Sequence, residues 1–568
     1  MHSPSVSSVR VSSASVGVFA PGHLGELTRF LPVELVDDVL IRTRTMQRRV
    51  RALPSRTGVY FVLALALFPQ LGYARVWTKL CTGLVGMTGL VAHPSEKALR
   101  DLRRRLGPAP LRELFEIVAG PLAQPRTVGV CFAGMRTVAF DGLNSLKVPD
   151  SPRNRHWLGY IRYRDGWAGY PNLRLMCLVE TGTRALLGAV IGDGERAGER
   201  DELTLARRLL PLLRPSMLVL GDRGFDAATF LHDLALTGAQ VLVRGRSQRI
   251  PPVEAVLTDG SYLSRLDGLT VRIIEAEIAV RSNDGHYAKD RYRLITTLID
   301  EHRYPAQTLI RLYHERWEIE SGYYALRHTM LGGRVLRSQD RAGLEQEVWA
   351  VLIVYQLLRM AMVDAVETCP GLDPDRASFT TALQTARDTL ITATKRPADA
   401  GSTTTGPDEL VGTVGAAVLA TLLPARRARY SSRTVKCPTS RYHDRGDRGG
   451  DTRPARSTPI TGIDITVCPP PAGQMTRHQA RYAARAAARL IGPRPPTRRE
   501  RITALMIAHP GRSWTAPELA PIIAATPQSM RTQLAEWVRL GLLTRHSRGR
   551  YTLDTPTPPR SSTRPPER

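Results

Sequence analysis

The sequence predicts an α/β fold whose strands and helices alternate in the middle of the chain. The first indication is a change of pattern near Arg136, where helical spacing of apolar residues gives way to short β-branched and aromatic runs. The second is the alternation of these runs with helical stretches, which is typical of a sheet with helices on its faces. Helical patterns on both sides of this region predict further domains.

The N-terminal part is predicted to be helical. Residues 1–20 are rich in Ser and Val and are expected to be disordered, and residues 21–125 contain helical stretches separated by Pro and Gly. The apolar run Val59–Phe68 ends at Pro69 and is shorter than the about 20 residues that cross a membrane. We therefore expect a buried helix here and no membrane partner.

Residues 126–430 are predicted to form the α/β domain. Two of its candidate strands carry aspartates, TVAFDGL with Asp141 and SMLVLGDRGF with Asp222. Carboxylates at strand ends stand where α/β sheets place their sites. An aspartate at such a position is also a common turn former or helix cap, so each one taken alone supports either interpretation.

A β-rich insertion is predicted within this domain at about residues 245–291. Alternating patterns there are broken by Asp-Gly pairs at 259–260, 267–268 and 284–285, which are typical of hairpin turns. The run YRLITTLID then returns to a core strand, and residues 341–430 are helical again.

The helix predicted between Leu309 and Leu331 carries the most informative polar pattern. At 100° per residue, Tyr313, Arg316, Glu320 and Arg327 lie on one side of the helix and border an apolar stripe. The simplest interpretation is an ion pair between Arg316 and Glu320, which are four residues apart. The alternative is a carboxylate directed along the edge of a core, with cations beside it.

Three carboxylates from separate elements can bind divalent cations. Mg²⁺ and Mn²⁺ prefer oxygen ligands, and two ions about 4 Å apart can activate an attacking oxygen and stabilise a leaving oxygen at phosphorus. Asp141, Asp222 and Glu320 are therefore candidate catalytic residues and metal ligands. The guanidinium groups of Arg316 and Arg327 suit a phosphate.

The charge of the chain is uneven. The net charge is +27, and residues 426–568 hold 27 basic and nine acidic residues, two-thirds of the excess. This asymmetry indicates nucleic acid as a partner, although an Arg-rich tail can also serve solubility alone. Residues 431–497 are predicted to be an Arg/Pro/Gly-rich linker and residues 555–568 a disordered tail. Six cysteines without metal-ligand or disulfide spacing fit a reducing cytoplasm.

Residues 498–554 resemble a winged helix-turn-helix domain. The pattern is helix, turn, helix, turn, longer helix and two strands. The last helix would offer Gln528 and Arg531 to the major groove of double-stranded DNA, and Arg548 in the wing would meet phosphates. The same fold also serves contacts between proteins.

The three acidic motifs resemble those of IS4-family insertion-sequence transposases. Tyr313-x2-Arg316-x3-Glu320, followed by x6 and a basic residue, is similar to the Y-x2-R-x3-E-x6-K signature of that family. AFDGL and LVLGDRGFD are similar to its two aspartate regions. Arg327 stands where the family has Lys, which keeps the charge and changes its geometry.

This resemblance implies an RNase H-like core whose DDE triad, Asp141, Asp222 and Glu320, binds Mg²⁺ or Mn²⁺, two ions in all, and cuts transposon ends. Water would attack first, and the freed 3′-OH would then attack target DNA. Tyr313 and Arg316 would position DNA near the cut. A homodimer in the DNA complex and a cytoplasmic location are implied as well.

Two features depart from the family pattern. Relatives that form a DNA hairpin stack a flipped base on a Trp of the insertion, but no Trp lies between Trp167 and Trp317, so Tyr262, Tyr287 or Tyr292 would have to replace it. The family pattern also gives no account of the C-terminal domain. Two alternatives therefore accompany the transposase interpretation: a DNA-binding regulator with an idle core, and a nuclease without strand transfer.

Overall fold

The computed structural model describes most of the chain, in two compact units at residues 1–484 and 485–568. The described residues are 22–49, 52–82, 93–160, 162–163, 166–167, 169–193, 201–282, 287–315, 323–392, 407–424, 429–430, 458–470, 498–509, 511–539, 542–547 and 549–553. Each unit is considered by itself.

The first unit is organised around a mixed sheet, as the sequence predicts. Its central strands, in spatial order, are β6 (Leu186–Ile191), β5 (Asn172–Glu180), β2 (Met135–Lys147), β7 (Met217–Gly221) and β8 (Gln240–Arg244). Strands β2, β7 and β8 are parallel, whereas β5 and β6 run antiparallel to their neighbours. These strands coincide with the apolar runs in the sequence, so the predicted α/β alternation is confirmed.

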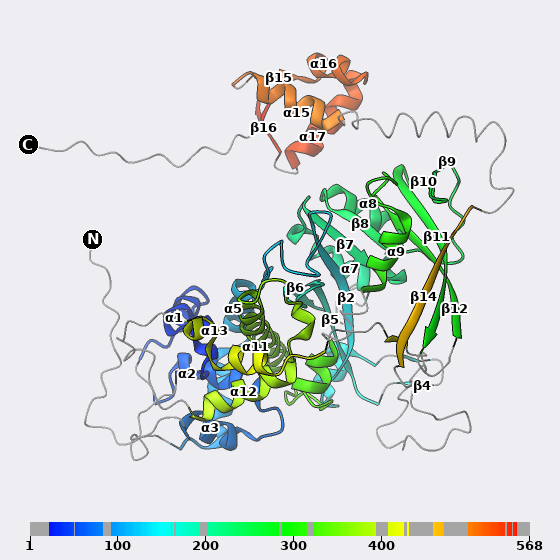
Figure 1. Ribbon diagram of the computed structural model, residues 1–568. Helices are drawn as coiled ribbons and strands as arrows, with labels where there is room; N and C mark the ends of the chain where they lie inside the picture. The colour runs from blue at the N-terminus through cyan, green and yellow to red at the C-terminus, as the bar shows by residue number, and fades with distance from the viewer. Residues whose placement is uncertain are drawn as a thin grey trace, which may run out of the picture. The chain divides into compact units, whose positions relative to one another are not determined.

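The predicted insertion extends the same sheet instead of forming a separate one (Figure 1). It consists of β9 (Ala255–Val256), β10 (Tyr262–Leu266), β11 (Leu269–Ser282) and β12 (Tyr287–Thr296). The far end of β12 pairs with β8, so one continuous strand leads from the insertion into the core. Asp267 and Gly268 both have positive φ between β10 and β11, which is the hairpin turn expected of an Asp-Gly pair.

The expected linker contains a strand. Residues Thr458–Cys468 form β14, which pairs antiparallel with β11, and Arg429–Tyr430 form β13, which pairs with β14. The prediction of a linker throughout residues 431–497 is therefore corrected for this segment. The β-branched run ITGIDITV covers the edge of β11, which would otherwise expose unpaired backbone groups.

Helices cover both faces of the central sheet. Residues of β2, β7 and β8 alternate between two apolar cores, because successive side chains of a strand point to opposite faces. One core includes α7 (Glu202–Arg207) and α8 (Ala228–Leu236). The other includes α9 (Ala306–Glu315), the π-helical turn Ala325–Met330 and the long helix α11 (Arg341–Glu367).

The N-terminal helices belong to the second of these cores. They are α1 (Val33–Arg42), α2 (Ser55–Leu67), α3 (Tyr73–Thr82), α4 (Glu96–Leu106) and α5 (Ala109–Val118). In Figure 1 they lie beside α11, α12 (Phe379–Thr392) and α13 (Pro407–Ala420), and the apolar residues of both groups form one cluster. The predicted boundary near residue 125 therefore separates sequence patterns but not packing units.

Individual contacts show how closely the two groups of helices pack. The rings of Phe115 on α5 and Trp349 on α11 are 5.2 Å apart. Arg103 on α4 is buried and donates to Gln346 Oε1 of α11 at 2.8 Å, so this arginine is committed to the core. Helix α11 is long and apolar enough to cross a membrane by composition, but 89% of its apolar window is buried inside the protein, as in a core helix.

The second unit is a small helical domain with a three-stranded sheet. Its helices are α15 (Arg498–Ala508), α16 (Ala516–Leu519), which continues into a 3₁₀ turn at Ala520–Ile523, and α17 (Pro527–Arg539). Its strands β15 (Trp514–Thr515), β17 (Arg550–Leu553) and β16 (Leu543–Ser547) form an antiparallel sheet in that order. The helices and the last two strands follow the order that the sequence predicts, whereas β15, between the first two helices, is a strand that it does not predict.

Candidate active site

The two predicted aspartates lie side by side on neighbouring strands. Strands β2 and β7 are parallel and pair Ala139 with Leu220. Continuing this register by two residues sets Asp141 beside Asp222, which follows β7 directly with an extended backbone. Because paired strands are about 4.8 Å apart, the two carboxylates share one region at the edge of the sheet.

Two tyrosines join the helical segment after the insertion to the strands that carry these aspartates. The hydroxyl of Tyr313, on α9, donates to the carbonyl oxygen of Gly221 at 3.0 Å. The hydroxyl of Tyr323 donates to the carbonyl oxygen of Asp141 at 2.6 Å. Both tyrosines are buried. The chain is thus fixed to both strands, before and after the segment in which Glu320 lies.

The structure describes only some of the site residues that the sequence predicts on the helix after the insertion. Glu320 and Arg316 lie outside the described residues. Tyr313 is predicted to bind DNA, but its buried hydroxyl instead bonds Gly221, so it lies beside the candidate site without facing solvent. Arg327 is half-buried within the π-helical turn. In the described part of the chain, no three His, Cys, Asp or Glu side chains are close enough together to bind one metal ion.

Burial keeps the hydroxyl of Tyr323 protonated. Burial raises the pKa of Tyr323 well above its usual range, and the neighbouring Cys177 and Asp141 add to this effect. Burial likewise raises the pKa of Cys177, the partner of Asp141 on β5, to about 12. Because the pKa of Tyr323 is higher in the folded protein than in the unfolded chain, its contribution to stability is complete below about pH 10. That contribution is lost as the pH rises through the folded-state pKa.

Replacing Tyr323 by Phe is expected to lower stability by about 1–2 kcal/mol, because the buried carbonyl oxygen of Asp141 loses its donor. DNA cleavage should fall about tenfold, as for groups that orient a metal ligand. Thermal melting and a cleavage assay measure the two effects. Tyr324→Phe is the matched control, since this neighbour is 63% exposed, and it should change neither. Equal effects of both variants would contradict the assigned role.

The turn after β7 is fixed by its own polar contacts. The amide of Gly224 donates to Asp222 Oδ1 at 2.6 Å. The buried Asp226 accepts from the amide of Arg246 at 2.7 Å and forms an ion pair with Arg249 at 2.8 Å. The loop after β8 therefore holds the turn that presents Asp222.

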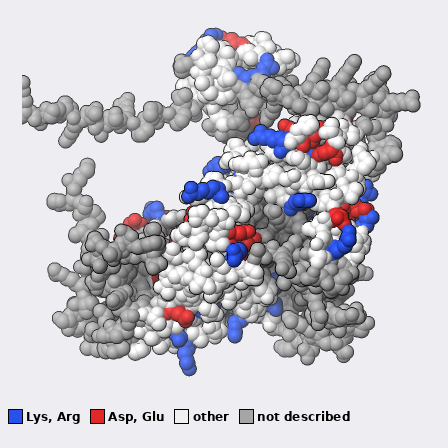
Figure 2. Space-filling model, in the orientation of Figure 1, with Lys and Arg blue, Asp and Glu red and all other residues white. Residues whose placement is uncertain are grey.

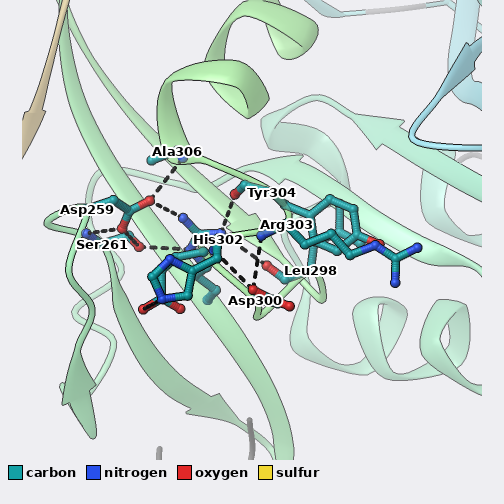
Figure 3. A network of polar contacts seen from close by, with 10 residues as sticks. Asp259, Ser261, Leu298, Asp300, His302, Arg303, Tyr304 and Ala306 are labelled. Atoms are coloured by element: carbon teal, nitrogen blue, oxygen red, sulfur yellow. Dashed lines mark hydrogen bonds and ion pairs between the residues drawn. The ribbon is translucent and has the colours of Figure 1, made fainter.

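A buried polar network fixes the start of α9 (Figure 3). Arg272 on β11 is fully buried and donates to Ser261 Oγ at 2.8 Å and to the carbonyl oxygen of Tyr304 at 2.7 Å. It also forms an ion pair with Asp259. Asp259 in turn accepts from the amide of Ala306 at 3.0 Å, at the first residue of α9. The insertion thereby sets the position of the helix that carries Tyr313.

Other aromatic residues differ in burial. Trp157, which follows β2, is buried and donates to Asp193 Oδ1 at 3.0 Å, so it is part of the core. Of the three tyrosines that would replace the insertion Trp, Tyr262 is buried and Tyr292 lies under the guanidinium of Arg244 at 3.9 Å. Tyr287 is 57% exposed.

The second unit presents its predicted residues to solvent. Gln528 and Arg531 are exposed on α17, and Arg531 Nη1 donates to Gln528 Oε1 at 3.1 Å. Arg548 lies outside the described residues.

On the face drawn in Figure 2, the described basic and acidic side chains form small separate groups. Charge alone therefore does not trace a path for DNA across that face.

Sequence reasoning missed two residues near the aspartates. Tyr323 falls on the apolar stripe of its helix, a position typical of a core residue, and its hydroxyl contact gives no sequence signal. Glu202 directly follows the N-cap Asp201, in the first turn of α7. Acidic residues are common there because they interact favourably with the helix dipole, so the sequence does not single Glu202 out.

Family models match two parts of the chain. A model for the insertion element 4 transposase N-terminal region matches residues 21–116, and a model for the transposase DDE domain matches residues 134–357. The second match contains Asp141, Asp222 and Glu320.

Two bacterial transposases are similar to the chain in sequence. Transposase InsG for insertion sequence element IS4 of Escherichia coli (strain K12) is 27% identical over 431 residues, 73% of this chain and 92% of that protein. Putative transposase InsZ of the same strain is 26% identical over 208 residues, 36% of this chain and 64% of that protein. Among solved structures, the piggyBac transposase synaptic complex with hairpin DNA covers 70% of this chain and 84% of its own, with 10% identity and a TM-score of 0.35. The chain belongs to the IS4 family of DDE transposases.

Proposed function

We propose that this transposase cleaves transposon ends and joins them to target DNA at a site formed by Asp141, Asp222 and Glu320. The observation that carries the proposal is the double attachment of the segment around Glu320, through Tyr313 to Gly221 and through Tyr323 to Asp141. Glu320 precedes Tyr323 by three residues, which span at most about 11 Å. The length of the chain therefore allows the third carboxylate to reach the other two, which supports a site in an RNase H-like arrangement of parallel β2, β7 and β8 with antiparallel β5 and β6.

The residues present fit a divalent metal, which DDE transposase domains use. Asp141 and Asp222 supply adjacent carboxylates, and hard cations prefer such oxygens. Glycines leave room around them, because a Cβ on Gly224 would lie 2.9 Å from Asp222 Oδ1. We propose Mg²⁺ or Mn²⁺, as two ions.

The protein groups have distinct tasks in this mechanism. Bound metal would supply Lewis acidity and a nucleophilic oxygen at neutral pH. Asp141, Asp222 and Glu320 would hold the metal in place, and the hydroxyls of Tyr313 and Tyr323 fasten the helical segment to the two strands. Arg316 and Arg327 would bind phosphate oxygens through their planar forks of donors.

One assay tests the proposal. The full-length protein is incubated with Mg²⁺ and a plasmid that carries the element's flanking inverted repeats, beside the Asp222→Ala variant. We expect excision and joining with the wild type alone. Cleavage without joining would indicate a nuclease, and binding of the repeats without cleavage would indicate a regulator; either result would overturn the proposal.

We further propose that residues 498–554 form a winged helix-turn-helix domain that binds the terminal repeats, with the protein acting in the cytoplasm as a homodimer on paired DNA ends. Exposed Gln528 and Arg531 on α17 support this assignment. So does the antiparallel sheet that follows this helix, whose β16–β17 hairpin stands where a wing would.

Arg531→Ala is expected to weaken binding of the terminal repeat by about 1–3 kcal/mol and to relax its sequence preference. Fluorescence anisotropy with repeat and unrelated duplexes at fixed salt measures this. Arg539→Ala removes the same charge from the last turn of α17 and should affect both duplexes alike. A uniform effect of Arg531→Ala on both duplexes would instead place it on the phosphate backbone.

A further inference from the structure

Glu202 brings another carboxylate to Asp222, and to the strand that carries Asp141, from the opposite layer of the fold. It lies in the first turn of α7, between β6 and β7, and is half-buried. A Cβ placed on Gly142, next to Asp141, would be 2.9 Å from Glu202 Oε1. A Cβ on Gly224 would be 3.6 Å from Glu202 Oε2 and 2.9 Å from Asp222 Oδ1. The oxygens of Glu202 and Asp222 thus border the same small volume.

The two glycines make this approach feasible. Gly142 follows Asp141 on β2, and Gly224 lies in the turn that Asp222 caps. A side chain at Gly142 would displace the carboxylate of Glu202, because its Cβ would lie 2.9 Å from Oε1. Neither glycine has a positive φ, so the backbone conformation does not require glycine at either position. The carboxylate of Glu202 occupies the space that a Cβ at Gly142 would take.

We infer that Glu202 is a positioning residue for the metal of the proposed DDE site, acting through water bound to the ion. This inference rests on the proposed function. Mg²⁺ usually keeps several waters and takes only one or two carboxylates directly, so an additional carboxylate can act by accepting hydrogen bonds from those waters.

The carboxylate of Glu202 has two effects in this position. Its negative charge raises the affinity for a divalent cation beside Asp222, and its acceptor oxygens orient the water molecules of that cation. A purely structural acid would influence the folding of α7 but not the affinity for metal. Metal affinity therefore distinguishes the two roles independently of DNA cleavage.

Titration of full-length protein with Mn²⁺, followed by electron paramagnetic resonance of the free ion, tests the inference. Glu202→Gln preserves size and shape and is expected to weaken Mn²⁺ binding roughly tenfold or more. Asp201→Asn is the matched control, because it removes a charge one residue away while Asn still caps α7. Its Mn²⁺ affinity should match that of the wild type.

The outcomes separate this inference from the proposed function. If Glu202→Gln binds Mn²⁺ like the wild type while Asp222→Asn loses binding, the inference is overturned and the metal site stands. If neither variant changes binding, both fail. A measurement on the wild-type protein does not depend on whether the variants fold. Fe²⁺ bound at the metal site, with peroxide, should cleave the backbone near residues 142, 202 and 224. Cleavage near 142 and 224 without cleavage near 202 would also contradict the role of Glu202.

Discussion

Replacing Asp141 by Asn is expected to lower the rate of DNA end cleavage by roughly a thousandfold or more, since metal-assisted stabilisation of the transition state is worth several kcal/mol. Asp141 lies within β2 beside Asp222, and Asn has nearly the same shape. The fold and DNA binding should therefore survive. Single-turnover cleavage, circular dichroism and a DNA-binding assay together measure the change.

A second substitution at this position tests metal ligation directly. Asp141→Cys should be inactive with Mg²⁺ and regain part of its activity with Mn²⁺, because a thiolate suits the softer ion better. The control is Asp101→Asn on α4, a 50%-exposed surface carboxylate paired with Arg104, which should cleave normally. Activity of Asp141→Asn near that of the wild type would exclude this aspartate from the metal site.

Replacing Arg272 by Met is expected to destabilise the catalytic unit by about 3–5 kcal/mol, because it leaves Asp259 without its buried partner. The carbonyl oxygen of Tyr304 and Ser261 Oγ also lose their donor. The midpoint of thermal unfolding should fall by about 5 °C or more. Cleavage should fall as well, since the network fixes the first residue of the helix that carries Tyr313.

The matched control for this prediction lies on the adjacent strand. Arg265 on β10 pairs with Glu254 at 3.3 Å, and its side chain is 54% exposed. Exposed ion pairs contribute about 0–1 kcal/mol, so Arg265→Met should leave the midpoint almost unchanged. Equal midpoints for the two variants would show that the buried ion pair of Arg272 contributes no more to stability than the exposed ion pair of Arg265.

The sequence predicts the central sheet well because its strands have local signals. Apolar, β-branched runs mark β2, β7 and β8, and the Asp267-Gly268 pair marks the hairpin between β10 and β11. The side-by-side placement of Asp141 and Asp222 follows from two such strands being parallel neighbours. The apolar runs and the turn depend on residues close together in the chain, whereas the pairing of β2 with β7 joins distant strands.

Features that depend on distant partners were not predictable. Strand β14 was expected to be linker because Pro, Gly and Arg dominate around it, and only its pairing with β11 makes it a strand. Tyr313 borders the apolar stripe of the predicted helix and Tyr323 lies on it, and no local pattern shows which carbonyl groups their hydroxyls meet. The space that Gly142 leaves for Glu202 likewise exists only after folding.

The core shared by the N-terminal helices and α11 sets the timing of assembly on the ribosome. Helix α2 is apolar on nearly every side and lies almost 300 residues before its partner α11. Its contacts with α3 and α4 can form early, but at 5–20 residues per second the surface of α2 that faces α11 stays uncovered for about 15–60 s. Chaperones that hold exposed apolar segments would then decide how much enzyme matures, and a product terminated before α11 would leave that surface exposed.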